Sequence, residues 1–178
     1  MISCQETETV VEPSVSGNLL FNGSFDANYT PSLWGWSIST DDTTIFSFSQ
    51  DVPPGQGGHF VHTDYSLVLK YRQHMPYGVY QVVPAVVGPQ IYFFSFWARN
   101  YFNGAEPAQL WLLRGNTVVK EKLIPILADS NWVHYFVYDT TDVELGDWIG
   151  ITLRVGGIGP RWTTARVVYD DCILRLVR

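Results

Sequence analysis

Short apolar runs separated by turn residues are the feature that most constrains the fold of this chain. Gly, Pro, Asn and Asp interrupt the sequence roughly every 8–12 residues, and aromatic and β-branched residues dominate between them, as in all-β proteins. No stretch shows the helical period of about 3.6 residues. The sequence therefore predicts strands at WGWSIS, TTIFSFS, SLVLKYR, GVYQVV, QIYFFSFWARN, AQLWLLRG, TVVKEKL, NWVHYFVYD, DWIGITLRV and ARVVYDDCILRL.

Alternation within these runs predicts two packed sheets. In the run 90–100 an apolar row opposes a mixed row, and the two rows are Tyr92, Phe94, Phe96 and Ala98 against Phe93, Ser95, Trp97 and Arg99. The run 147–155 likewise places Thr152 and Arg154 opposite three apolar residues. Two sheets over one core, with a partly exposed outer face, explain this pattern. We expect an all-β fold, an antiparallel β-sandwich spanning residues 18–178.

Residues 1–17 differ from the rest of the chain. MISCQETETVVEPSVSG contains scattered acids, a Pro and no period, so we expect an extended N-terminal arm. Because it has too little apolar surface to pack alone, we expect it to lie against another protein subunit. The arm is not a signal peptide, since it lacks a basic start and a long apolar segment. No later run is long and apolar enough to span a bilayer, so we expect no membrane insertion.

Charge and cysteine content narrow the possible partners. The net charge is −6, and Lys and Arg are scattered singly, which argues against nucleic-acid binding because that needs a basic stripe. The two cysteines, Cys4 and Cys172, do not make a disulfide framework. Cys172 falls among apolar residues and is interpreted as a small buried hydrophobe. A bridge between Cys4 and Cys172 is the less favoured alternative.

Four segments together resemble carbohydrate-binding modules of the family 4, 9, 16 and 22 type. They are NLLFNGSFD followed by WGWSI, GVYQVVPAVVGPQIYFFSFWARN, NWVHYFVYDTTD and VVYDDCILRL, and they occur in the family order over about residues 18–176. The resemblance implies a jelly-roll sandwich of galactose-binding-like topology. Such modules are usually attached to secreted enzymes, whereas this chain shows no enzyme domain.

Asp170 raises a question of its own, because it lies in a run that is otherwise apolar. By simple alternation it falls in phase with Val168 and Cys172, where an ionised carboxylate is costly unless it is paired or bound to a metal. In modules of the resembled type a structural calcium often ties the first strand to the last. The resemblance thus implies calcium ligands at Asp170 and Asp26, with backbone oxygens near residues 22–24. The alternative is that Asp170 accepts backbone hydrogen bonds or pairs with an Arg.

Candidate sugar-binding residues lie by alternation on the partly polar sides of their strands. A shallow sugar site needs aromatic rings flanked by hydrogen-bonding groups, and the candidates are Gln81, Trp97, Arg99, Thr152 and Arg154. Trp97 would be the stacking platform. The alternative is that Trp97 extends the core and that the arginines neutralise local acids. Trp34 and Trp36, in the Gly-Trp motif, are expected in the core.

Catalytic motifs are absent from the sequence. It has no Gly-x-Ser-x-Gly, no P-loop and no His-Glu-x-x-His, so we predict no enzyme. Two classes of function remain. The favoured one is a non-catalytic, lectin-like binding or display domain carried as a subunit on a larger assembly, at a virion surface or in the extracellular space. The alternative is a purely structural decoration or fibre component of a phage particle, with no surviving sugar site.

Overall fold

The computed structural model describes residues 17–25, 30–39, 45–53, 65–70, 77–101, 106–156 and 166–177. These contain no α-helix and hence no helix that could cross a membrane. Their strands are β1 (Ser37–Ile38), β2 (Phe46–Ser49), β3 (Ser66–Lys70), β4 (Tyr77–Pro84), β5 (Gly88–Asn100), β6 (Ala108–Arg114), β7 (Thr117–Ile124), β8 (Asp129–Val143), β9 (Trp148–Val155) and β10 (Arg166–Val177). Every predicted run overlaps one of these strands.

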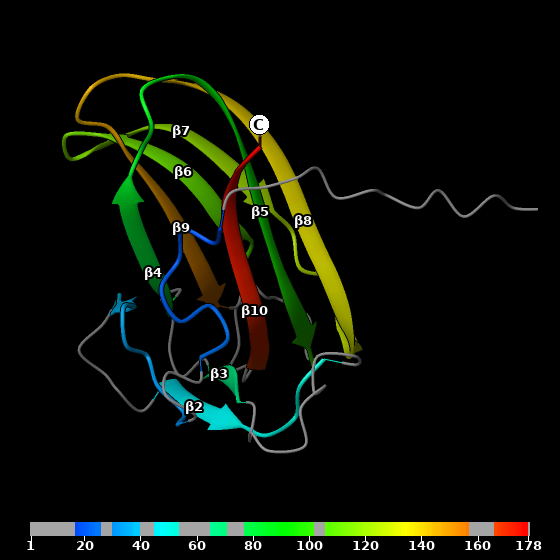
Figure 1. The fold of residues 1–178 in the computed structure, drawn as a ribbon. Coiled ribbons are helices and arrows are strands. Elements are labelled where there is room, and N and C mark those ends of the chain that lie inside the picture. The colour runs from blue at the N-terminus through cyan, green and yellow to red at the C-terminus, as the bar shows by residue number, and fades with distance from the viewer. Residues whose placement is uncertain are drawn as a thin grey trace, which may run out of the picture.

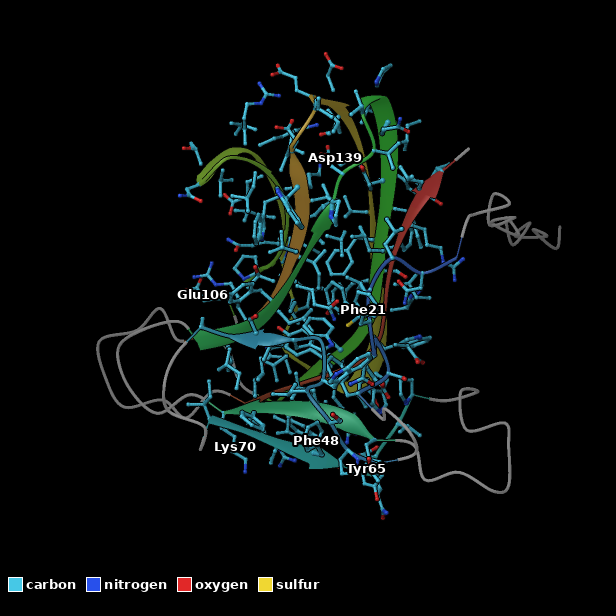
Figure 2. All side chains as sticks on the ribbon, turned by 60° about the vertical axis from the view of Figure 1, so that its left-hand side comes forward. Phe21, Phe48, Tyr65, Lys70, Glu106 and Asp139 are labelled. Carbon is cyan, nitrogen blue, oxygen red and sulfur yellow. The ribbon has the colours of Figure 1, made fainter. Side chains whose placement is uncertain are left out.

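The strands form two antiparallel sheets packed face to face (Figure 1). We call them the β5 sheet, with strand order β2-β3-β10-β5-β8, and the β9 sheet, with strand order β1-β4-β9-β6-β7. Side chains from both sheets fill the space between them (Figure 2). The predicted fold, an all-β antiparallel sandwich of jelly-roll type, is confirmed.

Alternation decides which side chains enter the core. Strand β5 contributes Tyr92, Phe94 and Phe96, and β9 contributes Ile151 and Leu153, all of them fully buried. Burying each such side chain stabilises the fold by about 1.5–3 kcal/mol. The predicted inner rows of these two strands are confirmed.

Strand β10 departs from simple alternation in its middle. Asp170 pairs with Trp97, and the register then shifts so that the next paired residue is Ile173. Within the shift, Asp171 has a φ of +46°. Such a bulge changes the phase of the strand, so that Cys172 lies in the core whereas Asp170 lies on the outer side with Trp97. The prediction that Asp170 and Cys172 share a face is therefore wrong.

The segment before β1 lies beside the second half of β10. The N–H of Leu19 donates to the carbonyl of Leu174 (2.8 Å), and the N–H of Cys172 donates to the carbonyl of Gly23 (2.9 Å). Asn18 Nδ2 donates to the Cys172 carbonyl (2.9 Å). A Cβ on Gly23 would lie 2.1 Å from that carbonyl oxygen, so the close approach requires glycine. Hydrogen bonds thus join the first segment to the last strand.

Cys172 is a free, fully buried thiol, as its interpretation as a small hydrophobe predicted. Burial raises the pKa of this thiol well above its ordinary value, so it stays protonated and unreactive at neutral pH. Cys4, like the rest of residues 1–16, lies outside the described residues.

The turn between β8 and β9 is tied to β6 by charged groups. The Asp147 carboxylate accepts hydrogen bonds from Arg114 Nε (3.1 Å) and Nη2 (3.0 Å). It also accepts one from the N–H of Glu144 (2.9 Å). The hydrogen bonds from Arg114, followed by the one from Glu144, lower the pKa of Asp147.

Replacing Asp147 with asparagine is expected to lower the stability near neutral pH and to matter less in acid. Because the folded-state pKa lies below the ordinary value of about 3.9, the ionised carboxylate stabilises the fold above that value. This contribution is lost as the pH falls through the folded-state pKa. Urea unfolding of both proteins near pH 7 and at about pH 3 measures the difference. A difference that stays constant between these pH values would contradict an electrostatic role.

Candidate functional site

The five predicted sugar-binding residues do not form one site. Trp97 and Arg99 lie on the outer face of the β5 sheet. Thr152 and Arg154 lie on the outer face of the β9 sheet, on the opposite side of the sandwich. Gln81 points toward the core. The strands that carry these residues were predicted correctly. Because β5 and β9 belong to different sheets, however, their outward-facing residues lie on opposite sides of the sandwich.

Gln81 shares the inner row of β4 with Val79 and Val83 and is 4% exposed. Its Nε2 donates to the carbonyl of Phe21 (2.6 Å), and its Oε1 accepts from the N–H of Phe21 (3.0 Å). The prediction that Gln81 lies on the partly polar side of its strand is wrong. The amide lies inside because the main chain of Phe21 needs both of its hydrogen bonds there.

Trp97 lies on an outer face, as predicted, but neighbouring groups cover its ring. His134 is its partner on β8, and the two ring centroids are 5.0 Å apart with an interplanar angle of 30°. Rings this close cannot lie side by side in one plane, so they overlap face to face and stand upright on the sheet. Trp97 therefore turns an edge to solvent. This orientation is unfavourable for its predicted stacking role, which stays a prediction.

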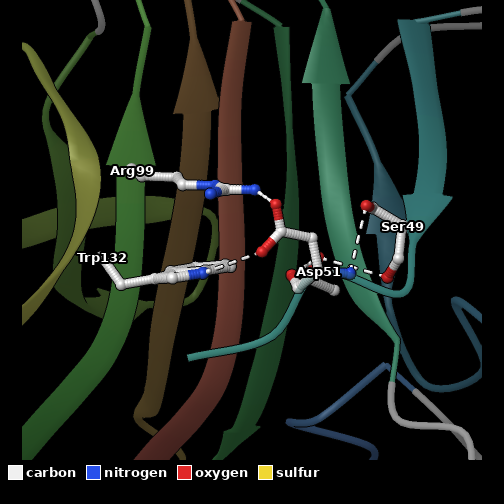
Figure 3. A network of polar contacts seen from close by, with 5 residues as sticks. Ser49, Asp51, Arg99 and Trp132 are labelled. Atoms are coloured by element: carbon white, nitrogen blue, oxygen red, sulfur yellow. Dashed lines mark hydrogen bonds and ion pairs between the residues drawn. The ribbon is translucent and has the colours of Figure 1, made fainter. Parts of the chain in front are cut away.

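Arg99 belongs to a network of polar contacts (Figure 3). It forms an ion pair with Asp51, and its Cζ lies 5.0 Å from the ring centroid of Trp132 and 5.1 Å from that of Tyr101. The N–H of Asp51 in turn donates to Ser49 Oγ (3.3 Å). Arg99 thus neutralises a local acid, as the alternative interpretation proposed. The same ion pair holds the segment after β2 against the sheet.

The outer face of the β9 sheet contains an aromatic side chain that the sequence analysis missed, Trp111 on β6. Its Nε1 donates to Thr152 Oγ1 (2.9 Å). A Cβ built on Gly150 would lie 2.6, 2.6 and 2.7 Å from Cη2, Cζ2 and Cζ3 of the indole. Nearly equal distances to three ring atoms mean that a face of the ring, not an edge, covers Gly150. The indole therefore lies flat on the sheet with its other face outward.

Polar side chains surround Trp111. Arg154 Nη1 lies 4.0 Å from Glu106 Oε2, so its guanidinium is only loosely paired. Gln109 Nε2 donates to Glu121 Oε1 (2.6 Å), and Glu121 is the cross-strand partner of Trp111 on β7. We call this surface the Trp111 face, defined by Glu106, Gln109, Trp111, Glu121, Thr152 and Arg154.

The Trp111 face has the chemistry of a shallow sugar site. A flat, outward-facing indole can stack on the C–H face of a pyranose ring, and the amide, carboxylate and guanidinium groups beside it can bond hydroxyls. Two of the five predicted residues, Thr152 and Arg154, belong to it. Its aromatic centre could have been found from the alternation of AQLWLLRG, which places Trp111 opposite the buried Leu110 and Leu112.

The structure describes one of the two predicted calcium ligands, Asp170, but not the other, Asp26. Asp170 is buried, and one of its oxygens accepts from the N–H of Asp171 (2.8 Å). Asp26 lies outside the described residues. Within the described part, no three His, Cys, Asp or Glu side chains cluster to form a metal site. Asn22 in the first segment has a buried Oδ1 with no hydrogen-bond partner, and such an oxygen suits a hard cation. The calcium site stays a prediction.

The two tryptophans of the Gly-Trp motif have opposite environments. Trp36 is buried in the core, as predicted, and its Nε1 donates to the carbonyl of Asn22 (3.0 Å). Trp34 is 66% exposed, so its predicted burial is wrong. Gly35 between them has a φ of +86°, and this turn carries Trp34 outward. There it packs edge-to-face on Phe21, with ring centroids 5.9 Å apart.

No family model and no curated protein matches the sequence. Solved structures match its fold. The enzymatically active domain of tailspike protein 4 from bacteriophage CBA120 matches with a TM-score of 0.67 and 17% identity, over 90% of this chain and 21% of that chain. The Stig cyclase Fisc from Fischerella sp. TAU matches with a TM-score of 0.62 and 18% identity, over 92% of this chain and 98% of that chain.

Carbohydrate-binding modules match as well. A family 61 module in complex with β-1,4-galactotriose has a TM-score of 0.54 and 18% identity, over 89% of this chain and 98% of that chain. Modules of families 16, 4 and 22 also match. The resemblance to this type of module is confirmed for the fold, which is all that such low identities establish.

Proposed function

We propose that this chain is a non-catalytic carbohydrate-binding domain that holds a neutral glycan on its Trp111 face. The observation that carries the proposal is the position of the indole. It lies flat over Gly150, is fixed by Thr152 and turns its free face to solvent. The shared fold with carbohydrate-binding modules supports it, including the one solved with β-1,4-galactotriose.

The charges of the Trp111 face favour a neutral glycan over an acidic one. Arg154 is its one cation among the described residues, and Glu106 and Glu121 are its two carboxylates. An acidic sugar would meet repulsion from these carboxylates, which adds to the net charge of −6 of the whole chain. Hydroxyl groups, in contrast, can donate to the carboxylates and accept from the guanidinium.

A non-catalytic role is supported by how these carboxylates are used. Glu106 lies beside Arg154, and Glu121 accepts from Gln109. Hydrolysis of a glycosidic bond needs one carboxyl group as an acid with a raised pKa and a second as base or nucleophile. Both carboxylates instead lie beside side chains of the Trp111 face itself, an arrangement that suits a binding surface.

A place on a larger assembly is the second part of the proposal. The similar domain of the bacteriophage tailspike is a fifth of its chain, since the match covers 21% of it. A single weak sugar site gains avidity when many copies are displayed together. Display on a larger particle therefore fits a shallow site on a small sandwich.

Nuclear magnetic resonance tests the glycan proposal directly. A glycan array selects a neutral oligosaccharide, which is then titrated into the protein at up to about millimolar concentration, where a shallow site binds. Each of the seven tryptophans has an indole N–H signal, and we expect the Trp111 signal, assigned with Trp111→Phe, to shift most. A shift centred on Trp97, or no shift with any array ligand, would refute the assignment of the site.

We also propose the structural calcium that the resemblance implied, with Asp170 and Asp26 as ligands. Asp170 suits it because this buried carboxylate lies at the bulge of β10, two residues before the bond that joins Cys172 to Gly23. Calcium would add an oxygen-coordinated link at this junction.

Removing calcium is expected to lower the melting temperature, and Asp170→Asn should abolish that dependence. A ligand that binds only the folded state stabilises it according to its free concentration. Thermal melts of the wild type and of Asp170→Asn, each with added calcium and with a chelator, measure the effect. Asp142→Asn changes an exposed carboxylate on β8 and should retain the dependence. Identical wild-type melting curves under both conditions would end the calcium proposal.

A further inference from the structure

The outer face of the β5 sheet has an aromatic patch, which we define as the exposed Phe136 and Tyr138 together with the buried Phe93. Phe136 and Tyr138 on β8 are 53% and 39% exposed. Phe93 on β5 lies beside them, with its ring centroid 6.4 Å from that of Phe136 and 4.9 Å from that of Tyr138. Strand β8 pairs with β5 alone, so within the described residues its other edge has no partner strand. A patch of this kind beside an open edge indicates an interaction site.

The rings of the patch are arranged for contact with a polypeptide rather than for stacking on a sugar. Phe93 is tilted against Phe136 by 32° and against Tyr138 by 46°, and Phe136 meets Tyr138 edge-on at 77°. The rings thus pack on each other and form no common flat surface. Aromatic clusters next to arginine are typical of the centres of protein interfaces, and Arg175 is the cross-strand partner of Phe93.

The first described residues leave the fold at the level of this patch. Leu19 bonds to Leu174 of β10, one residue before Arg175. Arg175 pairs with Phe93, which pairs with Tyr138 on β8. Adjacent strands are about 4.8 Å apart, so the first segment is about 10 Å from Phe93, two strands away, and about 14 Å from Phe136 and Tyr138, three strands away. Residues 1–16 directly precede Gly17 and so connect to the fold at this point.

The composition of residues 1–16 complements the outer face of the β5 sheet. MISCQETETVVEPSVS contains three glutamates, no Lys and no Arg, and several apolar and β-branched residues. Among the described residues of that face, four cations outnumber three carboxylates, and these are Lys70, Arg99, Arg166 and Arg175 against Asp51, Asp142 and Asp170. Lys70 lies at the end of β3 (Figure 2). Opposite charges of this kind direct association and fix its register.

We propose that residues 1–16 of one copy lie along β8 of a second copy and cover its aromatic patch. The direction of the chain favours a second copy. The segment that contains Leu19 runs antiparallel to β10, so the residues before Leu19 pass the end of β10 near Val177. From the level of Arg175 the patch extends in the other direction along the strands, from Tyr138 to Phe136. Sixteen extended residues reach at most about 55 Å, enough to cross to a neighbour and lie along the part of β8 that carries the patch. Main-chain bonds at the open edge and apolar contacts with the patch would hold the added segment.

Sedimentation velocity over a range of concentrations tests this exchange. We expect the wild type to dimerise, and both the deletion of residues 2–16 and the double variant Phe136→Glu/Tyr138→Glu to be monomeric. A matched control, Val118→Glu/Leu123→Glu, changes two β7 side chains that are 52% and 50% exposed and should dimerise like the wild type. Circular dichroism verifies that each variant is folded. A wild type that is monomeric at every concentration, a deletion variant that still dimerises, or a monomeric control would overturn the proposal.

Mixing the two monomeric variants distinguishes exchange between copies from docking within one copy. The deletion variant retains the patch, and the Phe136→Glu/Tyr138→Glu variant retains residues 1–16. Together they should form a one-to-one dimer through a single contact, at least about 100-fold weaker than the wild-type dimer, which has two contacts. No association in the mixture would refute an exchange. Glycan binding is a separate readout, because the Trp111 face lies on the other side of the sandwich.

Discussion

Replacing Trp111 with alanine is expected to remove detectable glycan binding while leaving the sandwich folded. Loss of a stacking ring costs on the order of 1–3 kcal/mol, by analogy with aromatic platforms for bases and with interface aromatics. A shallow site starts near millimolar affinity, about −4 kcal/mol, so this loss moves binding out of the measurable range. The fold should survive because the indole lies outside the core, on top of β9. Isothermal titration with the array-selected oligosaccharide measures the loss, and a thermal melt checks the fold.

Trp97→Ala is the matched control for this experiment. Trp97 and Trp111 are both partly buried tryptophans on outer faces, but they lie on opposite sheets. We expect Trp97→Ala to bind the glycan like the wild type. The reverse result, with binding lost in Trp97→Ala and kept in Trp111→Ala, would move the site to the β5 sheet.

Gly150→Ala tests the same platform without removing the ring. The new methyl group would lie 2.6 Å from two indole carbons, closer than any ordinary contact, so the indole must tilt away from the sheet. Binding should therefore fall even though Trp111 is still present. Normal affinity in this variant would show that the flat position of the ring is not required.

The strands of this protein could be predicted because their signals are local. Period-two alternation and turn residues are contained within each run, and every predicted run became a strand. The ends of β8 were missed, since Asp129, Ser130 and residues 140–143 include polar groups that a long edge strand tolerates. Residue composition alone does not distinguish such ends from loops.

The site could be predicted only in part because it depends on non-local order. Thr152 and Trp97 both lie in outward rows, but strand order places these rows on opposite sides of the sandwich. Nothing in the run around Asp170 signals the bulge that follows it and places Cys172, but not Asp170, on the core side. Trp111 becomes a platform only because Gly150, distant in sequence, is its cross-strand partner.

Gln81 shows the same limit, because both rows of β4 contain apolar residues and alternation alone could not orient it. Its buried amide replaces strand pairing for Phe21, whose N–H and carbonyl it bonds at 3.0 and 2.6 Å. These bonds hold the first segment against β4.

Replacing Gln81 with leucine, which is similar in size, is expected to lower the free energy of unfolding by about 2–4 kcal/mol. Leucine fills the space but leaves both main-chain groups of Phe21 without these partners, and each buried group left unpaired costs about 1–3 kcal/mol. Gln90→Leu is the control, because the Gln90 amide bonds the Val87 carbonyl at an exposed position and its loss should change stability by less than about 0.5 kcal/mol. Urea unfolding measures both variants. A loss below about 1 kcal/mol in Gln81→Leu would show that water replaces the amide, and that the first segment is held by its bonds to β10 instead.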